Sequence, residues 1–131
     1  MRRAQRRFFS RLKRPTVLRM ASLEITNLVP APRVELLPGA PLLAAIQAAG
    51  LDWAYACGGR GRCTTCRLHL TAGAENLLPL TAAEDRFRAL GRLPAGSRLA
   101  CQAGLAPHAP PTAELRAVVP PEGQLSHVKY A

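Results

Sequence analysis

Four cysteines carry most of the chemistry that this sequence could perform. Cys57, Cys63 and Cys66 lie within the short segment CGGRGRCTTC, which we call the cluster loop, and Cys101 follows much later in the chain. Four thiolates are a complete ligand set for an iron–sulfur cluster. The three glycines of the loop let successive backbone N–H groups turn inward and form a concavity that suits an anion. The pattern therefore predicts one [2Fe–2S] cluster bound by all four cysteines.

A structural zinc site is the main alternative for these cysteines. Zinc also accepts four thiolates, but its sites usually pair two CxxC-like knuckles, and Cys101 has no such partner nearby in sequence. A Rieske site would use two histidines, for which His69 and His108 are candidates. Because four cysteines already complete the ligand set, we interpret these histidines as surface residues. A zinc-stabilised interaction module remains the least favoured reading.

The cysteine spacing and the wording of the cluster loop resemble the [2Fe–2S] ferredoxins over residues 23–119. The C-x5-C-x2-C spacing resembles the adrenodoxin-like branch, and the loop is most similar to ferredoxin domains attached to class III adenylate cyclases. The resemblance implies a β-grasp, an α+β fold with a mixed sheet, one crossing helix and a Gly-rich cluster loop. It also implies that Cys57 and Cys63 hold the outer iron, and that Cys66 and Cys101 hold the inner one.

Composition and charge divide the 131 residues into three parts. The net charge is +10, but residues 1–19 hold eight basic side chains and no acid, so the remainder is nearly balanced. We expect residues 1–19 to be a disordered basic arm, 20–121 to be the ferredoxin domain, and 122–131 to be a loose C-terminal tail. No apolar run approaches a membrane span or a signal-peptide core. We predict a cytoplasmic protein, or a mitochondrial-matrix protein if the arm is a transit peptide.

Hydrophobic alternation predicts the strands of this domain. Alternating apolar residues favour strands over 22–28, 33–36, 66–71, 97–102 and 113–119. The first two would form a hairpin, and the fourth would deliver Cys101 to the cluster.

Helical spacing and capping signals predict two helices. The first begins at Pro41 and buries Leu42, Leu43, Ile46 and Ala49. The second begins with a capping box, in which Thr81 is followed three residues later by Glu84, and runs to about Leu90 with Phe87 and Leu90 on its apolar face. Between the first helix and the cluster loop, Trp53 and Tyr55 are expected to pack as core aromatics.

Charge near the cysteines bears on the partner. Arg60, Arg62 and Arg67 either supply positive charge beside the cluster or form a solvated rim. The resemblance to the adrenodoxin-like branch implies an acidic docking face on the second helix. In this chain, however, Glu84 and Asp85 are accompanied on that helix by two arginines, Arg86 and Arg88. The surface near the cluster should therefore be neutral to positive, and a partner should present acidic groups to it.

The sequence offers no nucleophile–base pair and no phosphate-binding loop, so the chain alone should not be an enzyme. We predict a monomeric one-electron carrier between a reductase and an acceptor enzyme, with no nucleic-acid partner and no transmembrane segment. The alternative is a redox-sensing or regulatory module that acts on a partner protein, as the similarity to cyclase-linked domains implies.

Overall fold

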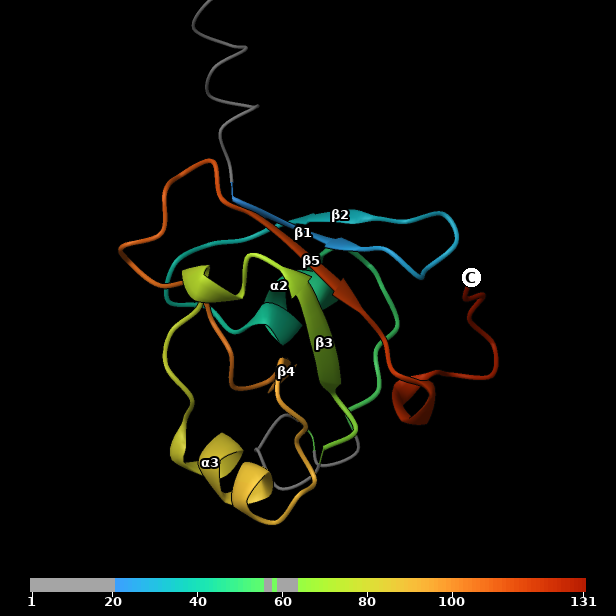
Figure 1. Cartoon of the computed structure of the whole chain (residues 1–131). Coiled ribbons are helices and arrows are strands. Elements are labelled where there is room, and N and C mark those ends of the chain that lie inside the picture. Colours follow the sequence, from blue (N-terminus) through green and yellow to red (C-terminus); the bar gives the residue numbers. More distant parts are fainter. Residues whose placement is uncertain (1–20, 56–57, 59–63) are drawn as a thin grey trace, which may run out of the picture.

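The computed structural model describes residues 21–55, 58 and 64–131 (Figure 1). The predicted arm, residues 1–19, lies outside the described residues. The strands are β1 (Ser22–Ile25), β2 (Arg33–Glu35), β3 (Arg67–Ala72), β4 (Ser97–Leu99) and β5 (Glu114–Val118). The helices are α2 (Leu42–Ala48) and α3 (Ala82–Ala89), with short 3-10 turns η1 (Ala74–Asn76) and η2 (Pro121–Gly123). The order of strands and helices is the predicted one.

The five strands form one sheet in the order β2-β1-β5-β3-β4. β1 and β5 are parallel, whereas β1 with β2, β3 with β4 and β3 with β5 are antiparallel. The hairpin predicted for the first two strands is thus confirmed. α2 crosses one face of the sheet, and α3 lies beyond its end (Figure 1). This is the mixed α+β arrangement expected of a β-grasp.

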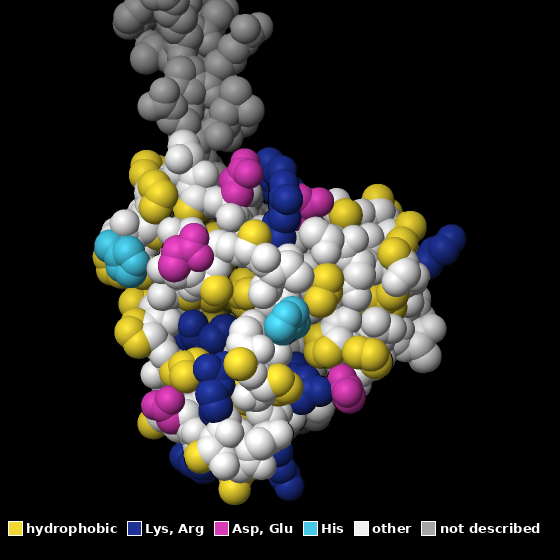
Figure 2. Space-filling model, in the orientation of Figure 1, with side chains coloured by type: hydrophobic (Ala, Val, Ile, Leu, Met, Phe, Trp, Pro, Cys, Tyr) yellow, Lys and Arg dark blue, Asp and Glu magenta, His cyan; other side chains and the backbone are white. Residues whose placement is uncertain are grey.

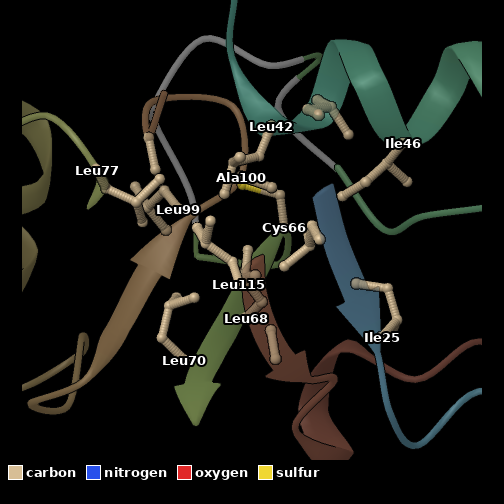
Figure 3. Close-up of a cluster of buried hydrophobic side chains, with 14 of the residues drawn as sticks. Ile25, Leu42, Ile46, Cys66, Leu68, Leu70, Leu77, Leu99, Ala100 and Leu115 are labelled. Atoms are coloured by element: carbon tan, nitrogen blue, oxygen red, sulfur yellow. The ribbon is translucent and has the colours of Figure 1, made fainter. Parts of the chain in front are cut away.

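Side chains that alternate along the strands meet α2 in a single core. Leu68 of β3 and Leu115 of β5 are almost completely buried, as are Leu42 and Ile46 of α2. Figure 3 shows these side chains around Cys66, which is itself 1% exposed. The predicted ligand therefore sits in the apolar centre of the molecule.

Two predictions about helix faces are wrong for residues at the helix ends. Ala49 is exposed because it caps the C-terminus of α2 instead of facing the sheet. Leu90 is 63% exposed because α3 ends at Ala89 and Leu90 is its C-cap. Phe87 is buried as predicted.

Two strands, β1 and β4, end three residues earlier than the alternation indicated. β1 ends at Ile25, because the N–H of Leu28 turns back to donate to the Ile25 carbonyl. β4 ends at Leu99, whose carbonyl accepts hydrogen bonds from the N–H groups of Gln102 and Ala103. A turn, instead of a strand, therefore carries Cys101.

Residues 122–131 are not the loose tail that their composition suggested. Val29 N–H donates to the Lys129 carbonyl at 3.1 Å, and Ala131 N–H donates to the Asn27 carbonyl at 2.8 Å. Val128 and Tyr130 pack against the core. Their apolar side chains and these backbone hydrogen bonds hold the segment on the β1–β2 hairpin.

Candidate metal centre

Antiparallel pairing of β3 and β4 brings two of the four predicted ligands together. Arg67 pairs with Leu99 across these strands, so Cys66 just before β3 and Cys101 just after β4 lie at the same end of the sheet. Both cysteines are buried and free of disulfides. Cys57 and Cys63 lie outside the described residues, as do Arg60 and Arg62.

The surroundings of Cys66 suit a thiolate ligand. Burial raises the pKa of the Cys66 thiol to about 12, while backbone hydrogen bonds from Cys101 and Ala100 act in the opposite direction by favouring negative charge on its sulfur. The Gln102 amide lies 3.7 Å from the Cys101 sulfur. A metal can replace the thiol proton and deprotonate such a ligand outright. The donor set therefore fits an iron–sulfur cluster, whose sulfurs also accept backbone hydrogen bonds.

Trp53 fixes the chain before the loop against the chain after it. Its side chain is 7% exposed, and its indole N–H donates to the Cys66 carbonyl at 3.0 Å. The predicted packing of Trp53 is thus confirmed. Tyr55, however, is 44% exposed, because the chain turns at the surface there and the Gly58 N–H donates to the Tyr55 carbonyl at 2.8 Å.

A buried ion pair holds α3 to the strand that leads to Cys101. Glu84 has no exposed side-chain surface, and its two carboxylate oxygens accept hydrogen bonds from Arg98 at 2.7 and 2.9 Å. They also accept from the backbone N–H groups of Leu99 and Thr81. Burial alone would raise the pKa of Glu84, but these hydrogen bonds outweigh it and hold that pKa below its usual value.

Sequence reasoning placed Glu84 in a capping box, which is present, but also on a surface docking face, which is wrong. Its N-cap partner Thr81 accepts from the Glu84 N–H at 3.3 Å. The sequence did not reveal the ion pair between Glu84 and Arg98. Arg98 lies in a predicted strand, and no local pattern there assigns it a partner on α3.

Arg67 is neither an unpaired cation nor a solvated rim. Its guanidinium lies 2.8 Å from the Glu122 carboxylate and also donates to the Arg92 carbonyl at 3.0 Å, with only 16% of its side chain exposed. The pKa of Glu122 is lowered because its carboxylate accepts a hydrogen bond from the backbone N–H of Glu122 itself and another from the Arg67 side chain.

Among residues 21–55, 58 and 64–131, three or more metal-ligating side chains do not gather at one point. Two of the four cysteines lie outside these ranges, so the full predicted set is not in view. Within the same ranges, no helix is both long and apolar enough to cross a membrane.

Curated relatives match the central part of the chain. The 2Fe-2S ferredoxin-5 of Aquifex aeolicus is 42% identical over 57 residues, which are 43% of this chain and 59% of that protein. Chlorosome protein I of Chlorobaculum tepidum is 44% identical over 52 residues, which are 40% of this chain and 21% of that protein. The chain thus spans less than two thirds of the length of these relatives.

Solved structures share the fold over a longer stretch. The ISC-like [2Fe-2S] ferredoxin FdxB from Pseudomonas putida superposes with a TM-score of 0.64 at 26% identity, covering 82% of this chain and 98% of that one. The Amycolatopsis cytochrome P450 reductase GcoB has a TM-score of 0.52 at 25% identity, covering 82% of this chain but 27% of the reductase.

The family comparison covers the cysteines themselves. The model of the 2Fe-2S iron-sulfur cluster binding domain matches residues 32–106, which is more than half of the chain and includes all four cysteines. With the fold and the buried cysteine pair, this match shows that the chain belongs to the [2Fe–2S] ferredoxin family and that its cofactor is one [2Fe–2S] cluster.

Proposed function

We propose that the protein is a one-electron carrier that accepts an electron from a reductase and passes it to an acceptor enzyme. We further propose that Cys57, Cys63, Cys66 and Cys101 are the cluster ligands. The observation that carries this proposal is the buried pair formed by Cys66 and Cys101, with backbone N–H groups directed at the Cys66 sulfur. When bound, the cluster supplies reversible one-electron redox chemistry.

The residues of the chain position this group and keep water from it. Trp53 closes one side of the site through its hydrogen bond to the Cys66 carbonyl. Leu68 and Leu99, both fully buried, line the strands next to the two cysteines. A buried and hydrogen-bonded surrounding of this kind reduces the rearrangement that accompanies a change of charge on the cluster. Such a site suits electron transfer without a bound substrate, and we propose a carrier instead of an enzyme.

The surface of α3 supports a proposal about the partner. Figure 2 shows Lys and Arg side chains on the lower half of this face, where Figure 1 places α3. Arg86 and Arg92 are exposed, and Arg88 donates only to backbone carbonyls, so its charge is not neutralised. Asp85 is the only exposed acid of α3, since Glu84 is buried. An acidic partner surface would complement this face and accelerate encounter.

A reductase is a suitable donor because a reductase, GcoB, contains a region with this fold. We propose that the carrier works in the cytoplasm, where thiols remain reduced before cluster insertion. Its acceptor is an enzyme that consumes single electrons.

The ligand proposal can be tested by anaerobic purification and metal analysis. The protein should contain about two iron and two acid-labile sulfide per chain and absorb visible light. Replacing any of the four cysteines by serine, for example Cys66→Ser or Cys101→Ser, should bleach or destabilise the cluster. Thr71→Ser, at an exposed position of β3, is the matched control and should leave the spectrum unchanged. Stoichiometric zinc without visible absorbance would refute the proposal.

The carrier proposal needs a separate assay. NADPH and a flavoprotein ferredoxin reductase should reduce the cluster, and cytochrome c as a generic acceptor should reoxidise it repeatedly in stopped-flow experiments. One equivalent of the protein should then support many equivalents of cytochrome c reduction. A cluster that is reduced but does not turn over would instead favour a sensor.

A further inference from the structure

We infer that residues 122–131, which we call the C-terminal strap, hold the chain on both sides of the cluster loop. They thereby influence the reduction potential and the retention of the cluster that the proposed ligand set binds. The inference rests on that proposed function, but it concerns residues that neither the family match nor the ligand set includes. The family match ends at residue 106. Three contacts, one hydrogen-bonded anchor and one charge effect support the inference.

The first two contacts lie immediately after the loop. Glu122 pairs with Arg67 at 2.8 Å, and Arg67 directly follows Cys66. The backbone of Gly123 approaches Thr65 so closely that a Cβ at this glycine would lie 3.2 Å from the Thr65 carbonyl oxygen. Two successive residues of the strap therefore contact both chain neighbours of Cys66.

The third contact lies before the loop. His127 Nε2 is 2.8 Å from the Asp52 carboxylate. Asp52 precedes Trp53, whose indole donates to the Cys66 carbonyl. Leu125 and His127 of the strap form one wall of a groove of about 520 Å³, and Trp53 lies in the same lining. The strap thus contacts the segment that leads into the loop as well as the one that leaves it.

The strap itself is fastened elsewhere, on the β1–β2 side of the sheet. Its end is held by the backbone hydrogen bonds from Val29 to Lys129 and from Ala131 to Asn27. Internally, the Leu125 N–H donates to the Tyr130 hydroxyl at 3.2 Å, which keeps the strap folded. Because it is anchored to the sheet, the strap can restrain the loop. A restraint of this kind lowers the frequency of the local openings that expose buried groups to solvent.

The Glu122–Arg67 contact also changes the charge beside Cys66. The Glu122 carboxylate neutralises the charge of Arg67, the residue that directly follows the proposed ligand Cys66. Reduction makes the cluster more negative, so an unpaired Arg67 would favour the reduced state and raise the potential. Loss of Glu122 should therefore act on the potential, whereas loss of the His127 contact should act mainly on cluster retention.

The test compares single and paired variants in the cluster-loaded protein. Glu122→Gln should raise the reduction potential, Arg67→Gln should lower it, and their combination should differ from the sum of the two shifts. Glu75→Gln is the matched control, since it removes the same charge from an exposed residue at the far end of β3. It should leave the potential close to that of the parent protein.

Cluster retention is measured as the half-life of visible absorbance in an excess of an iron chelator. His127→Ala and a chain ending at Gln124 should shorten this half-life several-fold, with little change of potential for His127→Ala. Far-UV circular dichroism confirms that each variant is folded. The inference is overturned if Glu122→Gln behaves as Glu75→Gln does and His127→Ala retains the parent half-life. A parent protein without iron would instead overturn the proposed function, so the two failures are distinguishable.

Discussion

Removal of the Glu84 carboxylate should be among the most destabilising single changes outside the cysteines. In Glu84→Ala, Arg98 keeps only hydrogen bonds to the carbonyls of Leu78 and Pro79, although just 11% of its side chain is exposed. Breaking a buried ion pair by removing one partner costs about 3–5 kcal/mol. The variant also leaves the Leu99 N–H without its acceptor. We therefore expect a loss of about 4 kcal/mol, a large part of the ~5–15 kcal/mol that stabilises a typical domain.

The same carboxylate should make stability depend on pH in the acidic range. The pKa of Glu84 is lower in the folded protein than its ordinary value, so the unfolded chain binds its proton more readily. Its contribution is complete above the ordinary glutamate pKa of about 4.3 and is lost as the pH falls through the folded value. The free energy of unfolding should thus decrease below about pH 4 in the parent protein and less so in Glu84→Gln.

Urea unfolding followed by far-UV circular dichroism and by cluster absorbance measures both effects. Glu114→Ala is the matched control, because Glu114 forms only an exposed ion pair with Arg33 at 3.8 Å. It should change stability by less than about 1 kcal/mol. A Glu84→Ala midpoint close to that of Glu114→Ala would refute the reasoning that the buried pair holds α3 to β4.

Three further changes test other parts of the molecule. Gly73→Ala should destabilise the fold by about 1–3 kcal/mol in urea unfolding, since Gly73 has a φ of +81° and a Cβ there would lie 2.6 Å from the Glu114 carbonyl oxygen; a parent-like midpoint would contradict this. A chain starting at Met20 should keep the visible spectrum and reduction potential, and loss of the cluster would show that the arm is needed. Arg86→Glu with Arg92→Glu should slow stopped-flow electron transfer to an acidic partner most strongly at low salt, where screening is weakest; an unchanged low-salt rate would remove α3 from the docking surface.

The features that could be predicted from sequence are those encoded within a few neighbouring residues. Leu115 and Ala117 are buried because they alternate along β5, and the alternation is visible in the sequence. The capping box at Thr81 is likewise local, because both of its hydrogen bonds join residues three positions apart. The segment CGGRGRCTTC is local too, and it holds three of the four cysteines whose pattern led to the family and its cofactor.

The features that could not be predicted depend on pairs distant in the chain. Arg98 reaches Glu84 only because β4 packs beside α3, and His127 reaches Asp52 across 75 positions. The largely polar composition of residues 122–131 suggests a loose tail until their partners on the β1–β2 hairpin are known. Leu90 was misplaced for a smaller reason, a helix end that is one residue earlier than predicted.

Burial also changes the net charge that α3 presents at the surface. Counted along the sequence, Glu84 and Asp85 cancel Arg86 and Arg88, and α3 is neutral. In the folded chain, Arg98 neutralises the Glu84 charge inside the protein. Asp85 is then the one acid of α3 that opposes the two arginines of the helix at the surface. Charges at the surface set the rate of encounter, whereas a neutralised buried pair contributes little to the external field. The surface of α3 is therefore more positive than its composition indicates, which is why the partner that we propose is acidic.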